Sequence, residues 1–462
     1  MRHPSTLAAL IAGALLLSAP ANQALADAAA RPARDVDRWQ EDWSALLDPA
    51  RRTQPLDTLK ALSITDAMWL STGLSVRERY ESNAAAHLGA GGRHADGDLL
   101  QRVQAHAELH VDDWRAFVQL EDARAYGKRQ PGPADANRLD LRNAFVEYKG
   151  RAGDAVLKLR AGRQDFAFDL QRFVSLREGP NVRQSFDAAW FDFEWTRWRV
   201  LGFISQPVQY RDGADFDDRS NGRLRFHTLR VERRVFGDGE LSAYYARYEA
   251  ADAHYTTVDG DEWRNIVDLR FAAAVGGFDW DLEAMGQQGR VGGLDVRAWA
   301  LGARSGYRMA TMWSQPRLGV QLDLASGDRD PTDRRLEALN PLFPNGSYFT
   351  RGGYTGDVNL VHIKPSLTLT PATGLSVMLS GALQWRQTVH DAVYVQPDLP
   401  IAGTAGNGGR WTGAYGQLRV SWQATAGLNA AFEAVHFDAG RTVERAGGRD
   451  SDYLGIELQW LW

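Results

Sequence analysis

Apolar and polar residues alternate with a period of two along most of the chain after residue 66. In 318–324, for example, aliphatic residues at the even positions alternate with Gly319, Gln321 and Asp323. Such alternation is typical of a β-strand with one apolar and one polar face. The pattern predicts strands at 69–82, 99–110, 114–125, 139–149, 154–168, 186–195, 198–206, 223–235, 240–250, 262–275, 278–288, 293–306, 315–325, 358–370, 374–388, 411–423, 427–437 and 451–462.

The final predicted strand is the most informative. Its apolar face consists of Leu454, Ile456, Leu458, Trp460 and Trp462, and it runs to the end of the chain. An amphipathic strand that ends on an aromatic residue fits the closing strand of an outer-membrane barrel, although a soluble β-sandwich can also end on an amphipathic strand. If the barrel is correct, this strand is the part that the barrel-assembly machinery would recognise.

The predicted connections alternate in length, which separates the two alternatives. Short ones fall at 112–113, 150–153, 196–197, 237–239, 276–277, 371–373 and 424–426, and long ones at 83–98, 126–138, 169–185, 207–222, 326–357, 389–410 and 438–450. Only 289–292 and 307–314 depart from this rule. Short periplasmic turns and long extracellular loops characterise transmembrane barrels. The sequence therefore predicts an all-β, transmembrane antiparallel β-barrel of about eighteen strands over residues 67–462.

The longest predicted loop, 326–357, contains the segment Asn340-Pro341-Leu342-Phe343-Pro344. Loops longer than about 12–15 residues are usually functional or disordered. The two prolines and two large apolar residues favour an ordered loop, which we expect to fold over or into the outer mouth of the barrel.

The N-terminus predicts export. A basic start is followed by the apolar stretch Leu7–Ala19 and by Ala24-Leu25-Ala26 before Asp27, as in a cleaved secretory signal peptide. We expect a signal peptide over 1–26, a periplasmic segment with a helical turn or two over 27–66, and a mature protein in the outer membrane of a Gram-negative cell. Trp39 and Trp43 give this segment its helix-like apolar spacing and suggest packing at the barrel mouth.

Composition narrows the function. The chain has no cysteine, and its net charge of −5 argues against a nucleic-acid partner. No catalytic motif is present, so we expect no enzyme, no cofactor and no metal site. The acidic run 328–333 lacks the glycine and closing glutamate of a calcium loop, and its carboxylates are expected to hold turns instead.

Charged residues oppose apolar ones in many predicted strands. A charge at mid-depth on the lipid face costs about 2–4 kcal/mol, so these side chains should point into the lumen. The cations are Arg77, Arg79, Lys158, Arg160, Arg270, Arg386 and Arg419, and the acids are Glu81, Glu108, Asp192, Glu194, Asp268, Asp279, Asp281, Glu283 and Glu433. They could form ion pairs that only fill the barrel, or they could line a conduit for an anionic solute. The facing of Arg142 and Arg163 is ambiguous.

Several longer motifs resemble one family, the alginate-export outer-membrane barrels. The resemblance is carried by Trp43–Leu46 with Asp48–Arg51, Arg77–Glu81, Gly162-Arg163-Gln164, Arg172-Phe173, Arg177–Asp187, Ser326-Gly327-Asp328, Asn340–Pro344, and Trp385-Arg386 with Asp391 and Tyr394. It covers essentially the whole mature chain and is closer to the general members than to the alginate-secreting prototype.

This resemblance implies an eighteen-stranded barrel with an arginine-rich channel for a uronic-acid polymer. By motif, it points to Arg77, Arg79, Arg163, Arg183 and Arg386 as residues of the solute path. We therefore expect a monomeric outer-membrane channel for an anionic solute, most simply alginate or another acidic polysaccharide or oligosaccharide. The alternatives are a general or small-acid porin, and a plugged barrel acting as a hydrolase or adhesin. Reversing the charge of Arg386 is expected to weaken the anion preference.

Overall fold

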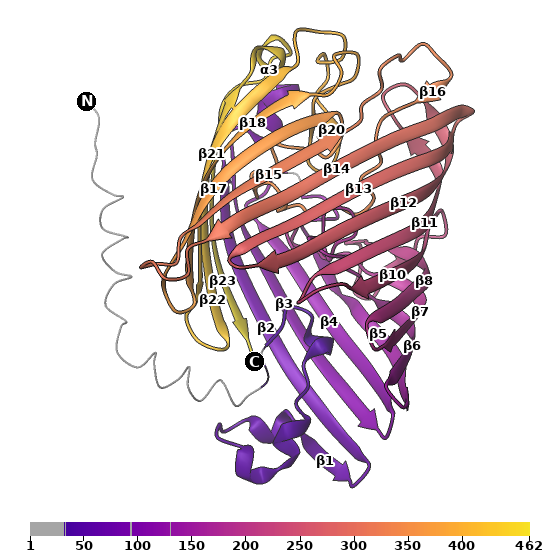
Figure 1. Ribbon diagram of the computed structural model, residues 1–462, viewed down its shortest axis with the longest axis vertical. Helices are drawn as coiled ribbons and strands as arrows, with labels where there is room; N and C mark the ends of the chain where they lie inside the picture. Colours follow the sequence, from indigo (N-terminus) through magenta and orange to yellow (C-terminus); the bar gives the residue numbers. More distant parts are fainter. Residues whose placement is uncertain (1–31, 33, 93–94, 130) are drawn as a thin grey trace.

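The fold is described from a computed structural model, which covers residues 32, 34–92, 95–129 and 131–462. Figure 1 shows a single β-barrel with a small N-terminal segment at its lower end. The predicted signal peptide and its cleavage site before Asp27 lie outside the described residues.

The barrel contains eighteen strands within the described residues and is closed, because its first strand pairs with both the second and the last. In order, the strands are β2 (Met68–Asn83), β3 (Asp96–Val111), β4 (Trp114–Tyr126), β5 (Asn137–Ala152), β6 (Ala155–Gln164), β7 (Phe186–Trp195), β8 (Trp198–Gln209), β10 (Leu224–Arg234), β11 (Glu240–His254), β12 (Asp259–Val275), β13 (Phe278–Val291), β14 (Leu294–Arg308), β15 (Arg317–Ala325), β17 (Leu360–Ala372), β18 (Leu375–Arg386), β21 (Trp411–Gln423), β22 (Leu428–Ala439) and β23 (Ser451–Leu461). All neighbours are antiparallel.

The predicted antiparallel barrel is thus confirmed. One predicted strand is too long: β6 ends at Gln164, and residues 165–168 turn into the barrel instead. The remaining short elements lie in the loops, and they are β9 (Arg219–Ser220), β16 (Arg335–Leu336), β19 (Tyr394–Val395), β20 (Leu399–Pro400), η6 (Ala86–Gly92) and α3 (Arg441–Arg445).

The two ends of the barrel differ. Tight connections such as 112–113, 196–197 and 276–277 lie at one end, here called the turn end, and long loops lie at the other, the loop end. In Figure 1 the loop end, with α3, is at the top. Both predicted exceptions are real: 292–293 is a tight turn at the loop end, and 309–316 is the longest connection at the turn end.

The outer surface of the barrel is apolar. On β23, Leu454, Ile456, Leu458 and Trp460 are exposed, while the alternating Tyr453 and Leu461 are buried. Large exposed aromatic side chains gather where strands meet the turn end, as expected for a girdle at the membrane interface. They include Trp114, Trp198, Phe278, Tyr307 and Trp422.

Two long loops fold into the barrel from the loop end and fill part of its lumen. Inner loop A (165–185) and inner loop B (326–359) meet at a parallel bridge between Val174 and Phe343. Their apolar side chains form one core with the inner faces of β7 to β15, where Phe343 packs on Phe186 and Phe226. The prediction that loop B is ordered is confirmed, and Pro341 and Phe343 are buried.

The N-terminal segment lies at the turn end. It consists of the short 3-10 helices η2 (Arg38–Gln40), η3 (Ser44–Leu47), η4 (Pro49–Arg51) and η5 (Asp57–Leu59), followed by β1 (Leu62–Thr65). Trp43 and Leu46 are buried with Ala61 in a small core of their own. Among the described residues, no helix is long and apolar enough to span a membrane.

Candidate functional site

Most cations of the lumen are neutralised by acids. Glu178 of inner loop A lies among three guanidiniums: its Oε1 is 3.2 Å from Arg77 Nη1 and contacts Arg102, and its Oε2 is 3.1 Å from Arg183 Nε. Burial raises the pKa of the Glu178 carboxyl, but Arg102, Arg183 and Arg77 together outweigh burial and hold that pKa at about 2. The carboxylate is therefore ionised at physiological pH, and it locks loop A to the wall of the barrel.

The other contacts of Arg77 and Arg79 also hold this loop. Arg77 Nη2 donates to Asn181 Oδ1 at 2.8 Å, and Arg79 Nη2 donates to the carbonyl of Gly179 at 2.7 Å. Arg79 Nε is 2.8 Å from Glu81. Both arginines point inward, but they are fully buried under loop A rather than open to a solute.

Inner loop A also binds the N-terminal segment. Arg183 pairs with Asp37 and, at 3.4 Å, with Asp165, and Trp39 Nε1 donates to Asp165 at 3.0 Å. Loop A, which enters from the loop end, therefore reaches the segment that enters from the turn end. Together they occlude one side of the lumen.

The wall formed by β10 to β13 carries a second paired network. Arg270 Nη2 is 2.6 Å from Asp281, and its Nη1 is 2.8 Å from Asp169 of loop A. Asp268 is buried close by, and neither of its oxygens has a hydrogen-bond partner among the described residues. This wall is covered by the packed loops, so Arg270 and Asp268 contribute to the plug side of the barrel.

Arg160 and Asp192 lie in a vestibule at the turn end. This cavity of about 630 Å³ separates the N-terminal segment from the inner wall. Arg160 Nη2 is 2.5 Å from Glu147, and its guanidinium lies 4.0 Å from the ring centre of Trp39 and 4.7 Å from that of Trp190. Asp192 is paired with Arg199.

The adjoining wall, from β14 to β21, differs because it presents cations that form no close ion pair, although Glu433 is the direct cross-strand neighbour of Arg419. Arg304 on β14, Lys364 on β17 and Arg419 on β21 form no ion pair within 4.0 Å in the described part of the chain. Lys364 is itself buried, 5% exposed, and its Nζ donates to the carbonyl of Phe349 at 2.8 Å. Arg304 Nη2 donates to the carbonyl of Tyr348 at 3.3 Å. These three residues are called the basic wall below.

The strand register places the three cations of the basic wall on one face of the sheet but in two different rows. Arg304 lies opposite Gln321, and Gln321 lies opposite Lys364, so the two cations share one hydrogen-bonded row of the sheet. Arg419 lies two inward-facing rows closer to the turn end, in the row that passes through Met378 and Thr368 to Arg317, and Ser366 and Gln417 face inward in the row between. Residues paired directly across strands project from the same face.

A cavity of about 190 Å³ lies against the basic wall. Besides the three cations, hydroxyl and amide groups line it, namely Ser305, Ser347, Ser366, Thr368, Gln321 and Gln417. Arg317, also in its lining, is paired with Asp279 at 2.8 Å. The site thus combines positive charge with several neutral hydrogen-bonding groups.

Arg419 is the only residue of the basic wall that the sequence had pointed to. The signal for the other two was present: Arg304 alternates with the exposed Leu301 and Tyr307, and Lys364 is adjacent to the exposed Ile363. What the sequence does not contain is the distribution of acids across the barrel, which depends on the register of distant strands.

Arg163 does not lie in the lumen, contrary to expectation. Its direct cross-strand partner is Asp187, at 2.9 Å, and both project from the outer face near the loop end, since the neighbouring Gln164 and Phe186 are buried inside. Arg142, whose facing was ambiguous, sits at a β-bulge between β4 and β5 and donates to the carbonyl of Gln184.

Arg386 is inward but enclosed. Its two terminal nitrogens donate to five backbone carbonyls of the loop 387–410, at 2.5 to 3.2 Å. The guanidinium is completely buried. Arg386 therefore organises this loop. We now expect Arg386→Glu to disrupt the structure of the loop rather than to weaken the anion preference.

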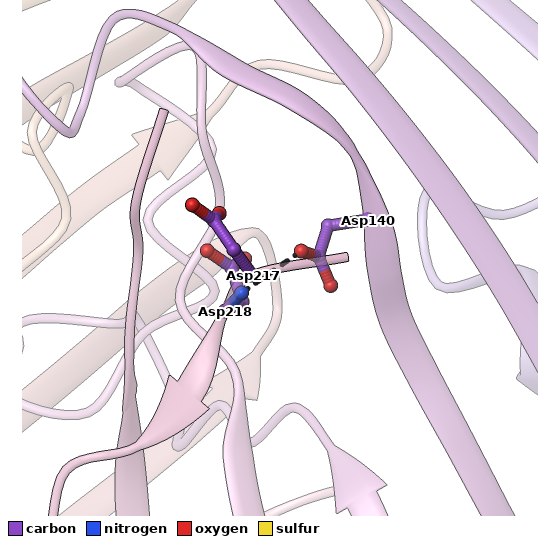
Figure 2. A group of neighbouring side chains, drawn as sticks. All are labelled: Asp140, Asp217 and Asp218. Atoms are coloured by element: carbon purple, nitrogen blue, oxygen red, sulfur yellow. Dashed lines mark hydrogen bonds between the residues drawn. The ribbon is translucent and has the colours of Figure 1, made fainter. Parts of the chain in front are cut away.

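One acidic cluster lies outside the lumen. Figure 2 shows Asp140 of β5 beside Asp217 and Asp218 of the loop 210–223, with ligand oxygens within 4.8 Å of one another. Backbone N–H groups occupy these carboxylates: that of Asp218 donates to Asp140 at 3.0 Å and that of Ala214 to Asp217 at 2.9 Å. Burial raises the pKa of Asp218 to about 6. These contacts explain the cluster as a loop-organising feature.

The acidic run 328–333 also forms turns, with Asp330 accepting from the backbone of Thr332.

The family model for alginate export matches residues 68–457, which is nearly the whole barrel. The chain belongs to this alginate-export family. A search of curated proteins gives no match.

Several solved structures share the fold of this family member. The Acinetobacter baumannii protein OccAB1 is 12% identical, with a TM-score of 0.58 over 88% of this chain and 99% of that one. The Pseudomonas aeruginosa protein opdK is 11% identical, with a TM-score of 0.56 over 85% and 98%. P. aeruginosa OccK2 (OpdF), in complex with glucuronate, is 14% identical, with a TM-score of 0.53 over 85% and 98%. These likenesses show the fold, a closed barrel that fits a monomer embedded in the membrane, and the family match concerns export.

Proposed function

We propose that this channel passes anionic solutes along the basic wall, and that its preferred solute is a small polyhydroxylated acid such as a uronate. The observation that carries the proposal is the contrast between the wall from β14 to β21 and the neighbouring parts of the lumen wall. Arg77, Arg79 and Arg270 form ion pairs with acids, whereas Arg304, Lys364 and Arg419 form none within 4.0 Å among the described residues. Unpaired cations lining a narrow pore favour anions.

The size of the cavity at the basic wall, which is much smaller than the vestibule of about 630 Å³, favours a small solute over a polymer. Drug-sized ligands occupy pockets of roughly 300–1,000 Å³, and the cavity at the basic wall measures about 190 Å³. Inner loops A and B pack firmly against the wall, with Phe173, Leu339 and Phe349 all buried. The neutral groups beside the cations, such as Ser366 and Gln417, suit the hydroxyls of a sugar acid. The solved relative that contains glucuronate provides a precedent for such a ligand in this fold.

A uronic-acid polymer presents the same carboxylates, so size is the property to test. In planar bilayers with potassium glucuronate as the only salt, we expect a steady anion current through the purified protein. Adding alginate chains should reduce this current by occupying the mouth, without carrying comparable current themselves. The proposal would be contradicted if alginate carried as much current per carboxylate group as glucuronate does. That result would favour passage of the polysaccharide.

We propose no enzymatic activity, since the lumen is lined by charge pairs and hydroxyls without a recognised catalytic motif.

A further inference from the structure

The seam of the barrel, where the first and last strands meet, has a step. β23 pairs with β2 only from Ser75 to Asn83, and Trp462 adds a reciprocal pair of backbone hydrogen bonds with Leu74. On its other side, β2 pairs with β3 from Met68 onward. The stretch 68–73 of β2 therefore extends beyond the last strand, and its edge on this side needs other partners, because unpaired backbone groups are costly in a membrane.

The N-terminal segment supplies these partners. β1 pairs with Met68, Trp69 and Leu70. Above β1, Lys60 Nζ donates to the carbonyl of Thr72 at 2.8 Å, and Thr72 Oγ1 donates to the carbonyl of Leu59 at 3.1 Å. The segment thus continues the wall of the barrel in the place where β23 has ended.

Arg38 and Lys60 connect the N-terminal segment to Trp462. Arg38 Nη2 donates to the carbonyl of Trp462 at 2.8 Å, and its Nη1 donates to that of Leu74 at 3.1 Å. Lys60 Nζ lies between the rings of Trp43 and Trp462, at 5.0 and 4.5 Å from their centres. Arg38 and Lys60 are almost completely buried. The position of β1 is therefore fixed relative to the barrel.

The outer face of this patch is apolar and continues the lipid-facing surface. Leu62 lies directly opposite Leu70, which in turn lies opposite Leu109, so all three project from the same face of the sheet. The inward face at this level is occupied by Trp69, which stacks on His110 at 3.9 Å. Leu62 and Ile64 are 38% and 49% exposed, close to the values for lipid-facing Leu454 and Ile456, 37% and 46%.

The height of the patch matches the membrane interface. Thr65 lies opposite Met68, Met68 opposite Val111, and Val111 opposite Trp114, which belongs to the aromatic girdle at the turn end. The row containing Leu62 lies one step further into the membrane than the row of Trp114.

We propose that β1 is a membrane-contacting element: Leu62 and Ile64 lie against phospholipid of the periplasmic leaflet and complete the lipid-facing wall at the seam. The N-terminal segment is then anchored in the interface instead of hanging free in the periplasm. The occupant of the apolar patch is lipid because Leu62 continues, through Leu70 and Leu109, the lipid-facing surface of β2 and β3. Ile64 lies beside it at a bulge of β1, without a direct cross-strand partner.

The absence of cysteine from the chain makes a direct test possible. Single variants Leu62→Cys and Ile64→Cys carry an environment-sensitive fluorophore in full-length protein, reconstituted in vesicles of phosphatidylethanolamine and phosphatidylglycerol. Leu458→Cys on the lipid face and Asp154→Cys in an exposed turn are the matched controls. Heat-modifiable migration on gels verifies that each labelled variant is folded.

We expect nitroxide-bearing lipids to quench the labels at 62 and 64 about as strongly as the label at 458, and iodide to quench them weakly. The proposal would be overturned if iodide quenched the labels at 62 and 64 as strongly as the label at 154 and the nitroxide lipids had little effect. That result would indicate a water-exposed strand edge that is available to a protein partner. If one variant does not fold, the other decides between these results.

Discussion

Reversing two charges of the basic wall, in the variant Lys364→Glu/Arg419→Glu, is expected to convert the channel from anion preference to cation preference. At about 8 Å and an effective dielectric of about 20, a unit charge interacts with another by about 2 kcal/mol, which corresponds to more than a tenfold change in relative permeability. Reversal potentials in planar bilayers measure this change. The neutral variant Lys364→Gln/Arg419→Gln should give an intermediate value.

The matched control is Arg441→Glu, in the exposed helix α3 of an outer loop. Exposed charges are screened within about 8 Å at physiological salt, so this variant should keep the wild-type selectivity. If it shifts the reversal potential as much as the double variant does, selectivity arises from the overall charge of the protein, and the basic wall has no special role.

Deleting Trp460–Trp462 is expected to abolish the folded barrel. The deletion removes the pairs of Leu461 and Trp460 with Ser75 and Val76, the hydrogen bonds between Trp462 and Leu74, and the ring that contacts Lys60. Each unsatisfied backbone group in the hydrocarbon region costs several kcal/mol. The fraction that migrates as heat-modifiable protein should fall at least roughly tenfold. A Trp462→Phe control, which retains the backbone bonds and an aromatic ring, should remain folded.

Normal heat-modifiable migration of the truncated protein would show that β23 does not close the barrel in the way described. The expected recognition of this strand by the barrel-assembly machinery remains a prediction, and the same truncation tests it in cells through the accumulation of periplasmic degradation products.

The strands could be predicted from the sequence because a period of two is a local property. The lipid face of β23 and the inward position of Arg77 both follow from alternation alone. The rule fails where the backbone leaves the regular pleat: Arg142 lies at a bulge, and Gly162, with a φ of 130°, interrupts the regular strand just before Arg163.

The role of an inward residue could not be predicted, because it depends on chain segments far away in the sequence. Arg77 is covered by Glu178 and Arg386 by the loop 387–410, so neither faces open lumen. Arg304 and Lys364 escape such pairing because no carboxylate in the described part of the chain lies within 4.0 Å of either. Alternation contains no information about which loops fold inward or about the register that brings acids to particular arginines.

The reversal potential of the wild-type protein under a tenfold gradient of potassium chloride tests the central claim most directly. An anion-selective channel makes the dilute side negative, by up to about 59 mV at complete selectivity. We predict this sign, because the basic wall attracts chloride and repels potassium. A reversal potential of the opposite sign would contradict the account of the basic wall as the path of an anionic solute.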